Sequence, residues 1–486
     1  MTLKPRPLWT LEEIAHAVGC DLGFAEIDRG LAVTGVSIDS RTLEAGDLFV
    51  AIKGPSQDGH DFVAAAFERG AAAALVVDDG ADYGAGNQRC LRIADTQDGL
   101  EKLGQAARAR MQGKVVAVTG SVGKTSVKEG LRQALAACGK THASAASYNN
   151  LWGVPLSLAR MPADTEFGVF EIGMNHAGEI VPLTAQVQPD IAVVTKIAPA
   201  HMEAFETLED VALAKSEIFS GLAGLRLAVI PHDSDWFELL EKQAKQNGAA
   251  HVFSFGETEA ADIQAQKITG HPHCSCLSGL VLGQEAAIRV GQPGRHNALN
   301  ALVVLGVVRL LDADLTLAGL ALSEMEALAG RGRKHVLDMA GGEVTLIDES
   351  YNANPESMAA ALVMLGQMPR MGQGRRIAVL ADMKELGEES GQLHSSLAAC
   401  IESEDIDLVM TYGADMLHLH HALPPGRIGV HAPSLEKIET ALLSDLQPDD
   451  VVMVKGSNSM GLSRVVRTLC TTHSRPPQPK THEVAS

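Results

Sequence analysis

The sequence has few aromatic residues, no long apolar run and no excess of positive charge, and each shortage excludes a class of protein. No stretch reaches the roughly 18 uninterrupted apolar residues of a membrane-spanning helix. Aromatic residues make up only 4% of the 486 residues, so alanine, valine and leucine must fill the cores, as in α/β proteins. The formal net charge of −20 argues against nucleic acid as a general partner, and local donors would have to hold an anionic substrate.

The sequence also shows no recognisable pattern of cysteines and no recognisable targeting signal. The seven cysteines are scattered, odd in number and without the spacing of a zinc site, which is typical of reduced thiols. Residues 1–19 lack an apolar segment with a small-residue cleavage site, so no secretory signal is indicated. We therefore expect a cytoplasmic protein without stable membrane insertion.

The length predicts more than one domain, because a single core stops growing at roughly 250–300 residues. Composition and strand patterns favour three α/β domains. We expect an N-terminal domain at 1–112, a central domain at 113–330 and a smaller Rossmann-like domain at 331–473. The Pro-rich, polar residues 474–486 are expected to be a disordered tail.

The most informative stretch runs from Lys114 to Leu131 and predicts a strand, a tight loop and a helix. Gly120 and Gly123 allow successive N–H groups to turn inward around phosphate oxygens at the helix N-terminus. The strict phosphate-loop spacing is not met, because Val118 stands at the place of the first glycine, and the variant is T-G-S-x-G-K-T. Lysine would add a mobile cation and threonine a hydroxyl for Mg²⁺. The expected nucleotide-binding residues are Gly120, Ser121, Val122, Gly123, Lys124, Thr125 and Ser126.

Further strand patterns in the central part alternate with helical ones, which favours a mainly parallel, doubly wound sheet. In such a sheet, ligands gather beyond the carboxyl ends of the strands. The expected strands are 114–119, 167–172, 190–195, 225–230 and 250–255, whereas 256–290 carries no clear pattern.

Two side chains lie where this topology would place catalytic or ligand-binding residues, beyond the carboxyl ends of strands. Glu171 lies near the end of its strand and is either a Mg²⁺ ligand or an ordinary strand-end carboxylate. His201 follows the strand at 190–195, and by itself it is as readily explained as an ordinary loop histidine.

Lys215 interrupts the apolar face of a helix expected to begin near Leu208. Its neighbours one turn away are apolar and include no acidic partner, and burial should lower the pKa of its ammonium group. A neutral amine of this kind can take up CO₂ as a carbamate and become an anion near a metal; the alternative is a snorkelling lysine. The neighbours are Val211, Ala212, Ile218 and Phe219.

The remaining candidates lie on either side of the central part. Asn297 suits the first turn of a helix, whereas Asn300 is not needed there and could reach a nucleotide. Ser40 and Arg41 follow a strand in the first domain, where they form either a solvated turn or a binding site.

The third domain shows strand patterns at 344–348, 376–382, 407–413 and 451–457. No G-x-G-x-x-G follows its first strand, which argues against dinucleotide binding there. Asp348 ends that strand.

Several motifs, in one order over nearly all of the chain, resemble those of the Mur ligase family. They are VTGSVGKTSVKE, SYNNLWGVPLSL, EIGMNHAGEI, APAHMEAFETLEDVALAKSEIF, GRHNALNAL, AGRGRKH and LIDESYNANPESM. The resemblance implies catalytic roles for Lys124, Glu171, His201 and Lys215, and a metal-binding set of Thr125, Glu171, His201 and Lys215. It also implies nucleotide contacts for Asn297, Asn300, Arg331 and Asp348, and substrate contacts for Ser40, Arg41 and Asn150, with the first domain binding the UDP part of the substrate.

The activity that the resemblance implies is an ATP-dependent, ADP-forming ligation in peptidoglycan precursor synthesis. Ser-Tyr-Asn-Ala-Asn-Pro and Asp-Met-Lys-Glu-Leu-Gly in the third domain are similar to the member that joins D-alanyl-D-alanine to a UDP-N-acetylmuramoyl tripeptide through an acyl phosphate. ATP, two Mg²⁺ sites, a carbamylated Lys215 and a monomer are implied. Asn458 and Ser463 depart from the family pattern near the expected dipeptide pocket.

Three alternatives remain open from the sequence. A diaminopimelate- or lysine-adding Mur ligase would differ in the third domain. A folylpolyglutamate-synthase-like ligase would share the ATP-binding core but should lack the Asp-Ser-Arg domain in front of it. A nucleotide-dependent regulatory module would have no need of the metal-binding set.

Overall fold

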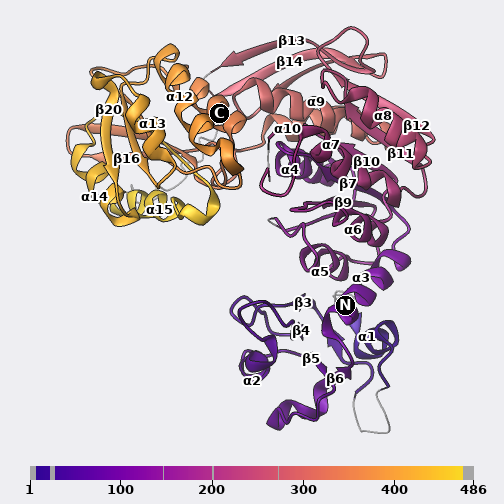
Figure 1. The fold of residues 1–486 in the computed structure, drawn as a ribbon. Coiled ribbons are helices and arrows are strands. Elements are labelled where there is room, and N and C mark those ends of the chain that lie inside the picture. Colours follow the sequence, from indigo (N-terminus) through magenta and orange to yellow (C-terminus); the bar gives the residue numbers. More distant parts are fainter. Residues whose placement is uncertain (1–6, 22–27, 146, 200–201, 272, 474–486) are drawn as a thin grey trace, which may run out of the picture.

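The computed structural model describes residues 7–21, 28–145, 147–199, 202–271 and 273–473, and these form three α/β bodies in chain order (Figure 1). Each body is built on its own sheet, of four, nine and six strands, and a small two-stranded sheet accompanies the first. None of the described helices is long and apolar enough to cross a membrane. The predicted tail at 474–486 lies outside the described residues.

The first body is a parallel sheet in the order β3-β4-β5-β6, with an antiparallel pair β1-β2 beside it. Helix α1 starts at a capping box formed by Thr10 and Glu13 and stops at Gly19, which has a φ of 71°. The strands are β1 (Trp9–Thr10), β2 (Ala32–Val33), β3 (Gly35–Ser37), β4 (Asp47–Val50), β5 (Ala73–Val77) and β6 (Cys90–Ile93), and the helices are α1 (Leu11–Val18), α2 (Val63–Glu68) and α3 (Thr96–Arg110).

The second body carries the central sheet, in the order β15-β14-β13-β12-β11-β10-β7-β9-β8. Its strands are β7 (Lys114–Thr119), β8 (Thr141–Ala143), β9 (Phe167–Glu171), β10 (Ile191–Val194), β11 (Leu227–Pro231), β12 (His251–Gly256), β13 (Ile263–His271), β14 (Cys274–Val281) and β15 (Gln284–Val290). Its helices are α4 (Lys124–Ala136), α5 (Gly153–Ala159), α6 (Ile180–Val187), α7 (Leu208–Ser216), α8 (Phe237–Gln246), α9 (Arg295–Leu310) and α10 (Leu315–Ser323).

Helices cover both faces of this sheet, and successive residues of a strand contact opposite layers. In β7, Val116 and Val118 pack with α4, α9 and α10, whereas Val115 and Ala117 pack with α5 to α8. A strand buried on both faces reads as a continuous apolar run, as β7 does.

The patternless stretch at 256–290 forms β13, β14 and β15, which the sequence did not predict. The β13-β14 and β14-β15 pairs are antiparallel, whereas the pairs from β8 to β13 are parallel. In β14 each buried residue alternates with a less buried one, and in β15 Val290 is the one buried residue, so these strands lack the long apolar runs that marked the inner ones.

The third body is a sheet in the order β16-β17-β21-β18-β19-β20, in which β16 alone is antiparallel to its neighbour. Helices α11 to α13 cover one face, and α14 and α15 cover the other. The strands are β16 (Arg333–Met339), β17 (Gly342–Glu349), β18 (Arg376–Ala381), β19 (Leu408–Tyr412), β20 (Ile428–Ala432) and β21 (Val451–Lys455), and the helices are α11 (Pro355–Gly366), α12 (Ser390–Ser403), α13 (Met416–Ala422), α14 (Leu435–Asp445) and α15 (Ser463–Thr472).

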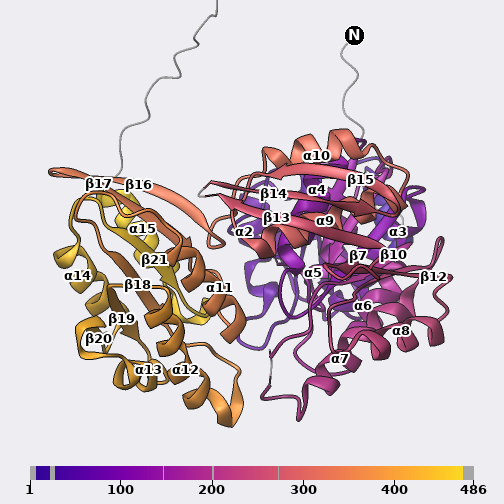
Figure 2. The ribbon, with the colours of Figure 1, turned by 90° about the horizontal axis from the view of Figure 1, so that it is seen from above.

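The predicted fold class is therefore confirmed: a three-domain α/β protein with a doubly wound, mainly parallel central sheet and a Rossmann-like C-terminal sheet. Figure 2 shows the six-stranded body, orange to yellow, to one side of the other two. The sequence missed β16, α13 and β20 in that body.

Candidate active site

The phosphate loop leaves β7 at the point where the strand order of the central sheet reverses. From β7 the chain moves to β8 and β9 on one side and then to β10 on the other. In open α/β sheets this switch point is where loops separate and ligands bind. The carboxyl ends of β7, β9 and β10 meet there, and they lead to Gly120, Glu171 and Thr195 respectively.

The loop after β7 is fastened to the loop after β10. The amide of Ser121 donates a hydrogen bond to Lys196 O at 2.6 Å, and the Thr195 hydroxyl donates to Val122 O at 2.6 Å. A Cβ on Gly120, whose φ is +146°, would lie only 2.0 Å from the Thr195 hydroxyl oxygen. A residue without a side chain is therefore required at this position.

The second glycine faces the helix that carries the two predicted asparagines. Gly123 has a φ of +88°, and a Cβ there would lie 2.9 Å from Asn300 Oδ1. Asn297 lies in the first turn of α9, as predicted, and its Nδ2 donates to Pro293 O at 2.7 Å. Ser126, Asn297 and Asn300 together line a void of about 10 Å³. The structure thus brings the asparagine side chains to the phosphate loop.

Lys124 begins α4 and folds back over its own loop. Its Nζ donates to the backbone oxygens of Gly120 and, at 3.4 Å, Ser121. Burial lowers the pKa of Lys124 below its ordinary value; the carboxylate of Glu171 acts in the opposite direction, and the guanidinium of Arg331 adds to the lowering. The lysine therefore lies within electrostatic range of both a predicted metal ligand and the start of the third body.

Arg331 reaches the phosphate loop from the linker to the C-terminal sheet. Its Nη2 donates to Thr125 Oγ1 at 3.0 Å, and its guanidinium carbon lies 4.2 Å from the centroid of the Tyr351 ring. The Thr125 side chain, predicted to bind Mg²⁺, is thus the acceptor of an arginine in this structure.

Asp348 supports that linker instead of pointing freely into the site. Its Oδ2 accepts from Gly330 N at 2.7 Å, and its Oδ1 accepts from the amide and hydroxyl of Ser350 at 3.1 and 2.6 Å. Gly332 N donates to the backbone oxygen of Asp348 at 2.8 Å. These bonds fix the backbone on both sides of Arg331.

Glu171 ends β9 with one carboxylate oxygen held and the other without a partner. The side chain is 1% exposed, and Oε1 accepts from Asn149 Nδ2 at 2.8 Å. Among the described residues, buried Oε2 has no hydrogen-bond partner. A buried carboxylate oxygen of this kind fits the oxygen preference of Mg²⁺.

Lys215 lies in α7, which begins at a capping box of Thr207 and Asp210, as expected for a helix starting near Leu208. Its side chain is 1% exposed, and its ammonium has no hydrogen-bond or ion-pair partner among the described residues. Burial, and next the positive charge of Lys124, hold the pKa of Lys215 well below its ordinary value. The predicted buried, readily neutralised lysine is present.

The predicted metal set is only partly visible. His201 lies outside the described residues, so its position relative to Glu171 and Lys215 is not assigned. Within the part of the chain that the structure describes, no three His, Cys, Asp or Glu side chains form a group that could hold a metal ion. Of the predicted metal set, Glu171 thus offers a free oxygen that fits a cation, whereas the amine of Lys215 offers no oxygen.

The three predicted substrate contacts are not gathered at the phosphate loop. Ser40 and Arg41 follow β3 in the four-stranded sheet, where exposed Arg41 pairs with Asp39 at 2.8 Å and holds the pKa of that carboxyl below its usual range. Asn150 Oδ1 accepts from Gly153 N at 2.9 Å, at the start of α5.

Two residues that the sequence reasoning missed support the predicted ones. Asn149, next to the predicted Asn150, is the side chain that holds Glu171. Lys128 is fully buried one turn after Lys124, and its Nζ donates to Ser144 O at 2.9 Å. In the sequence, only the double asparagine of the motif pointed to Asn149. Lys128 was indicated by its place on the inner face of the helix.

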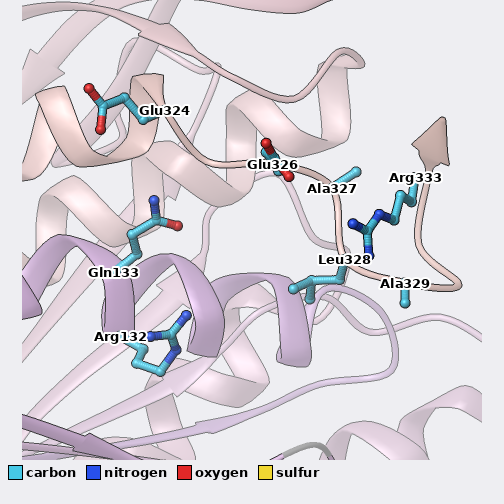
Figure 3. Close-up of a pocket in the computed structure, with 8 residues that line it drawn as sticks. All are labelled: Arg132, Gln133, Glu324, Glu326, Ala327, Leu328, Ala329 and Arg333. Atoms are coloured by element: carbon cyan, nitrogen blue, oxygen red, sulfur yellow. The ribbon is translucent and has the colours of Figure 1, made fainter. Parts of the chain in front are cut away.

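A cavity of about 510 Å³ lies beside this region, between the outer part of α4 and the linker (Figure 3). Arg132 and Gln133 approach it from α4, and Arg333 approaches it from the start of β16. None of the predicted site residues lines it. The other lining residues are Glu324, Glu326, Ala327, Leu328 and Ala329.

Three family models match successive parts of the chain. Residues 32–129 match the Mur ligase family catalytic domain, 118–308 match the Mur ligase middle domain, and 332–458 match the Mur ligase glutamate ligase domain.

Individual relatives match nearly the whole chain. The UDP-N-acetylmuramoyl-tripeptide–D-alanyl-D-alanine ligase of Escherichia coli K12 is 33% identical over 95% of this chain and 98% of its own. A crystal structure of MurF from Acinetobacter baumannii has a TM-score of 0.81 at 27% identity, covering 95% of this chain and 99% of that one. MurF from Thermotoga maritima in complex with ADP has a TM-score of 0.73 at 26% identity, covering 90% and 96%.

Replacing Asn149 by alanine should weaken Mg²⁺-dependent nucleotide binding. The substitution removes the donor that orients the Glu171 carboxylate, and loss of such a support typically costs about 10–100-fold in metal affinity. Calorimetric titration of ADP at several Mg²⁺ concentrations measures this. The matched control is Asn150→Ala, which should lower stability by about 1 kcal/mol through the lost bond to Gly153 N and leave the Mg²⁺ dependence unchanged. Equal Mg²⁺ dependence in both variants would contradict the assignment.

Proposed function

The chain belongs to the Mur ligase family, and on that premise we propose that it joins D-alanyl-D-alanine to the terminal carboxylate of a UDP-N-acetylmuramoyl tripeptide, with hydrolysis of ATP to ADP and phosphate. The observation that carries the proposal is the 33% identity to the E. coli ligase over 98% of that enzyme. The product is a peptidoglycan precursor, and the reaction takes place in the cytoplasm, where ATP is available.

The proposed reaction has two steps. The tripeptide carboxylate attacks the γ-phosphorus of ATP, an acyl phosphate forms and ADP leaves. The neutral amine of D-alanyl-D-alanine then attacks the acyl carbon, an amide forms, and phosphate leaves while the nitrogen loses a proton. Both steps bring anionic groups together, so positioned cations carry most of the catalysis.

The phosphate loop residues from Gly120 to Ser126 hold the triphosphate through backbone N–H groups at the N-terminus of α4. Lys124 turns from its own loop oxygens to the transferring phosphoryl group, and Arg331 turns from Thr125 to the nucleotide phosphates. Asn297 and Asn300, which line a small void together with Ser126, are proposed to contact the nucleotide. Asp348 keeps Arg331 in place through the linker amides.

The metal proposal concerns two Mg²⁺ sites. Thr125 and Glu171 would hold one ion, and His201 and carbamylated Lys215 would support the other. Bound Mg²⁺ supplies charge neutralisation between phosphoryl group and carboxylate. The neutral amine of Lys215 adds to dissolved CO₂ and loses a proton, which gives a carbamate; burial of the lysine without a counter-ion supports this step.

Recognition of the acceptor is assigned to the first body and to the segment before α5. Ser40 and Arg41, at the exposed carboxyl end of β3, suit a uridine diphosphate, because arginine binds phosphate strongly. Asn150 is proposed to contact the muramoyl peptide. A monomer is proposed, since each of these groups is supplied by one chain.

The alternative functions fit less well. A diaminopimelate- or lysine-adding ligase is disfavoured by Ser-Tyr-Asn-Ala-Asn-Pro after β17 and by the E. coli relative. A folylpolyglutamate-synthase-like ligase would have no role for the four-stranded N-terminal sheet. A regulatory module leaves the unpartnered oxygen of Glu171 and the buried Lys215 unexplained.

ATP turnover should require both co-substrates, the UDP-tripeptide and the amine, because the acyl phosphate forms only on a bound carboxylate and the amine then consumes it. D-alanyl-D-alanine should support turnover far better than diaminopimelate or glutamate. A coupled ADP assay across a panel of UDP-muramoyl peptides and amines measures both. Equal ADP formation without the UDP-tripeptide would instead identify a regulatory nucleotidase, and preference for diaminopimelate would move the chain to a sister ligase.

Lys124→Ala should lower kcat by roughly 10²-fold or more, the loss found for one electrostatic stabiliser of the transition state. The side chain is only partly buried, so folding should change little, and circular dichroism on heating checks this. The matched control is Lys140→Ala, which removes an exposed ion pair with Asp164 on the same body. Near-normal turnover of Lys124→Ala would refute its phosphate role.

Lys215→Ala should lower kcat by about 10–100-fold, and a small carboxylate such as acetate or formate should restore part of it. The missing group is an anion beside a metal, so recovery should follow carboxylate concentration and should not occur with alkylamines. Steady-state rates with each additive measure this. Recovery with an amine would show that Lys215 acts as an ammonium, and full activity without additive would leave it a structural lysine.

A further inference from the structure

Tyr351, which follows β17, contacts both the linker and the segment that supports Glu171. Its amide donates to Gly330 O at 3.1 Å, and its ring stacks on the Arg331 guanidinium with 4.2 Å to the ring centroid. Its hydroxyl donates to Ser147 Oγ in the central body. None of the roles proposed above uses this tyrosine.

The contact with Ser147 continues to the predicted metal ligand. Ser147 O accepts from the amide of Asn149 at 2.8 Å, and Asn149 Nδ2 donates to Glu171 Oε1 at 2.8 Å. A further bond, from Gly173 N to Asn149 O at 2.8 Å, ties the same segment to the end of β9. The third body therefore reaches Glu171 through the side chains of Tyr351, Ser147 and Asn149 and the backbone of 147–149.

The ring of the same tyrosine acts on the opposite side of the site. Arg331 stacks on it and donates to Thr125 Oγ1 at 3.0 Å, in the first turn of α4. A guanidinium held against an aromatic face keeps its orientation while its N–H groups stay available. One residue of the third body is thus linked to the nucleotide side through its ring and to the metal side through its hydroxyl.

We propose that Tyr351 is a positioning residue that couples docking of the C-terminal body to the placement of Glu171 and Arg331. The hydroxyl orders the segment 147–149, and the ring holds Arg331 toward the phosphates. When the C-terminal body moves away, both supports are lost together, so phosphoryl transfer is confined to the docked arrangement. This inference rests on the proposed ligase function.

Two single variants and their combination test the hydroxyl contact. Tyr351→Phe keeps the ring on Arg331 and removes the hydroxyl, and Ser147→Ala removes its acceptor. Each should lower kcat for amide formation by roughly three- to tenfold, the effect expected of one neutral hydrogen bond, and should raise the Mg²⁺ concentration needed for half-maximal rate, because Glu171 is less well oriented. The double variant should lose no more than either single variant, because both remove the same contact. Losses that multiply would overturn the proposal.

Hydrogen–deuterium exchange gives a second readout that needs no turnover. In Tyr351→Phe, peptides covering 147–150 should exchange faster, since the Asn149 amide loses the ordered Ser147 oxygen. Tyr83→Phe is the matched control, because the buried Tyr83 hydroxyl has no hydrogen-bond partner among the described residues, and it should match the wild type in both assays. Unchanged exchange in Tyr351→Phe would overturn the coupling. If wild-type protein made no amide product at all, the proposed ligase function would fail instead.

Discussion

The burial of Lys215 is the constraint on which the electrostatics of the candidate site depend. Removing an unpaired charge from water costs several kcal/mol even after the protein relaxes, so burial lowers the pKa of this side chain well below its ordinary value. Lys124 and Arg331 add positive charge nearby. The charge of Arg331 lowers the pKa of Lys124, and the charge of Lys124 lowers the pKa of Lys215. Although the protein has a net charge of −20, these cations form a local region of positive charge. Anionic substrates, or a carbamate, are the groups that would relieve it.

The place of this region follows from the close approach of two loops at the switch point. Gly120 lets the loop after β7 press against Thr195 and Lys196, and Gly123 lets it pass Asn300. A side chain at Gly120 would push this loop away from the end of β10, and one at Gly123 would push it away from α9. The cations and Glu171 gain their effect because this backbone geometry exists before any ligand binds.

Patterns with a strong local cause were predicted well. The inner strands β7 and β9, the helix that bears Lys215 and the burial of that lysine all follow from apolar periodicity, and the family was confirmed from motif order. The partly exposed strands β14, β15 and β20 were missed because few large apolar side chains mark their buried positions. The motif likewise could not tell Asn149, which holds Glu171, from Asn150, which accepts a hydrogen bond from the first amide of α5. Only tertiary structure distinguishes neighbouring asparagines.

The two outer bodies are attached to the central one by different kinds of contact, and this decides which of them can move. The first shares an apolar core with α5, and Trp9 Nε1 and Arg160 Nε donate to backbone oxygens across the boundary at 2.8 and 2.6 Å. The third is held by side-chain polar contacts, from Arg331, Tyr351 and the Lys196–Glu356 ion pair. Polar contacts at a hydrated boundary exchange with water at little net cost, whereas exposing a core costs about 25 cal/mol for each Å² of apolar surface. Displacing the C-terminal body would therefore cost less free energy than displacing the first body, because water can replace the contacts of Arg331, Tyr351 and Lys196.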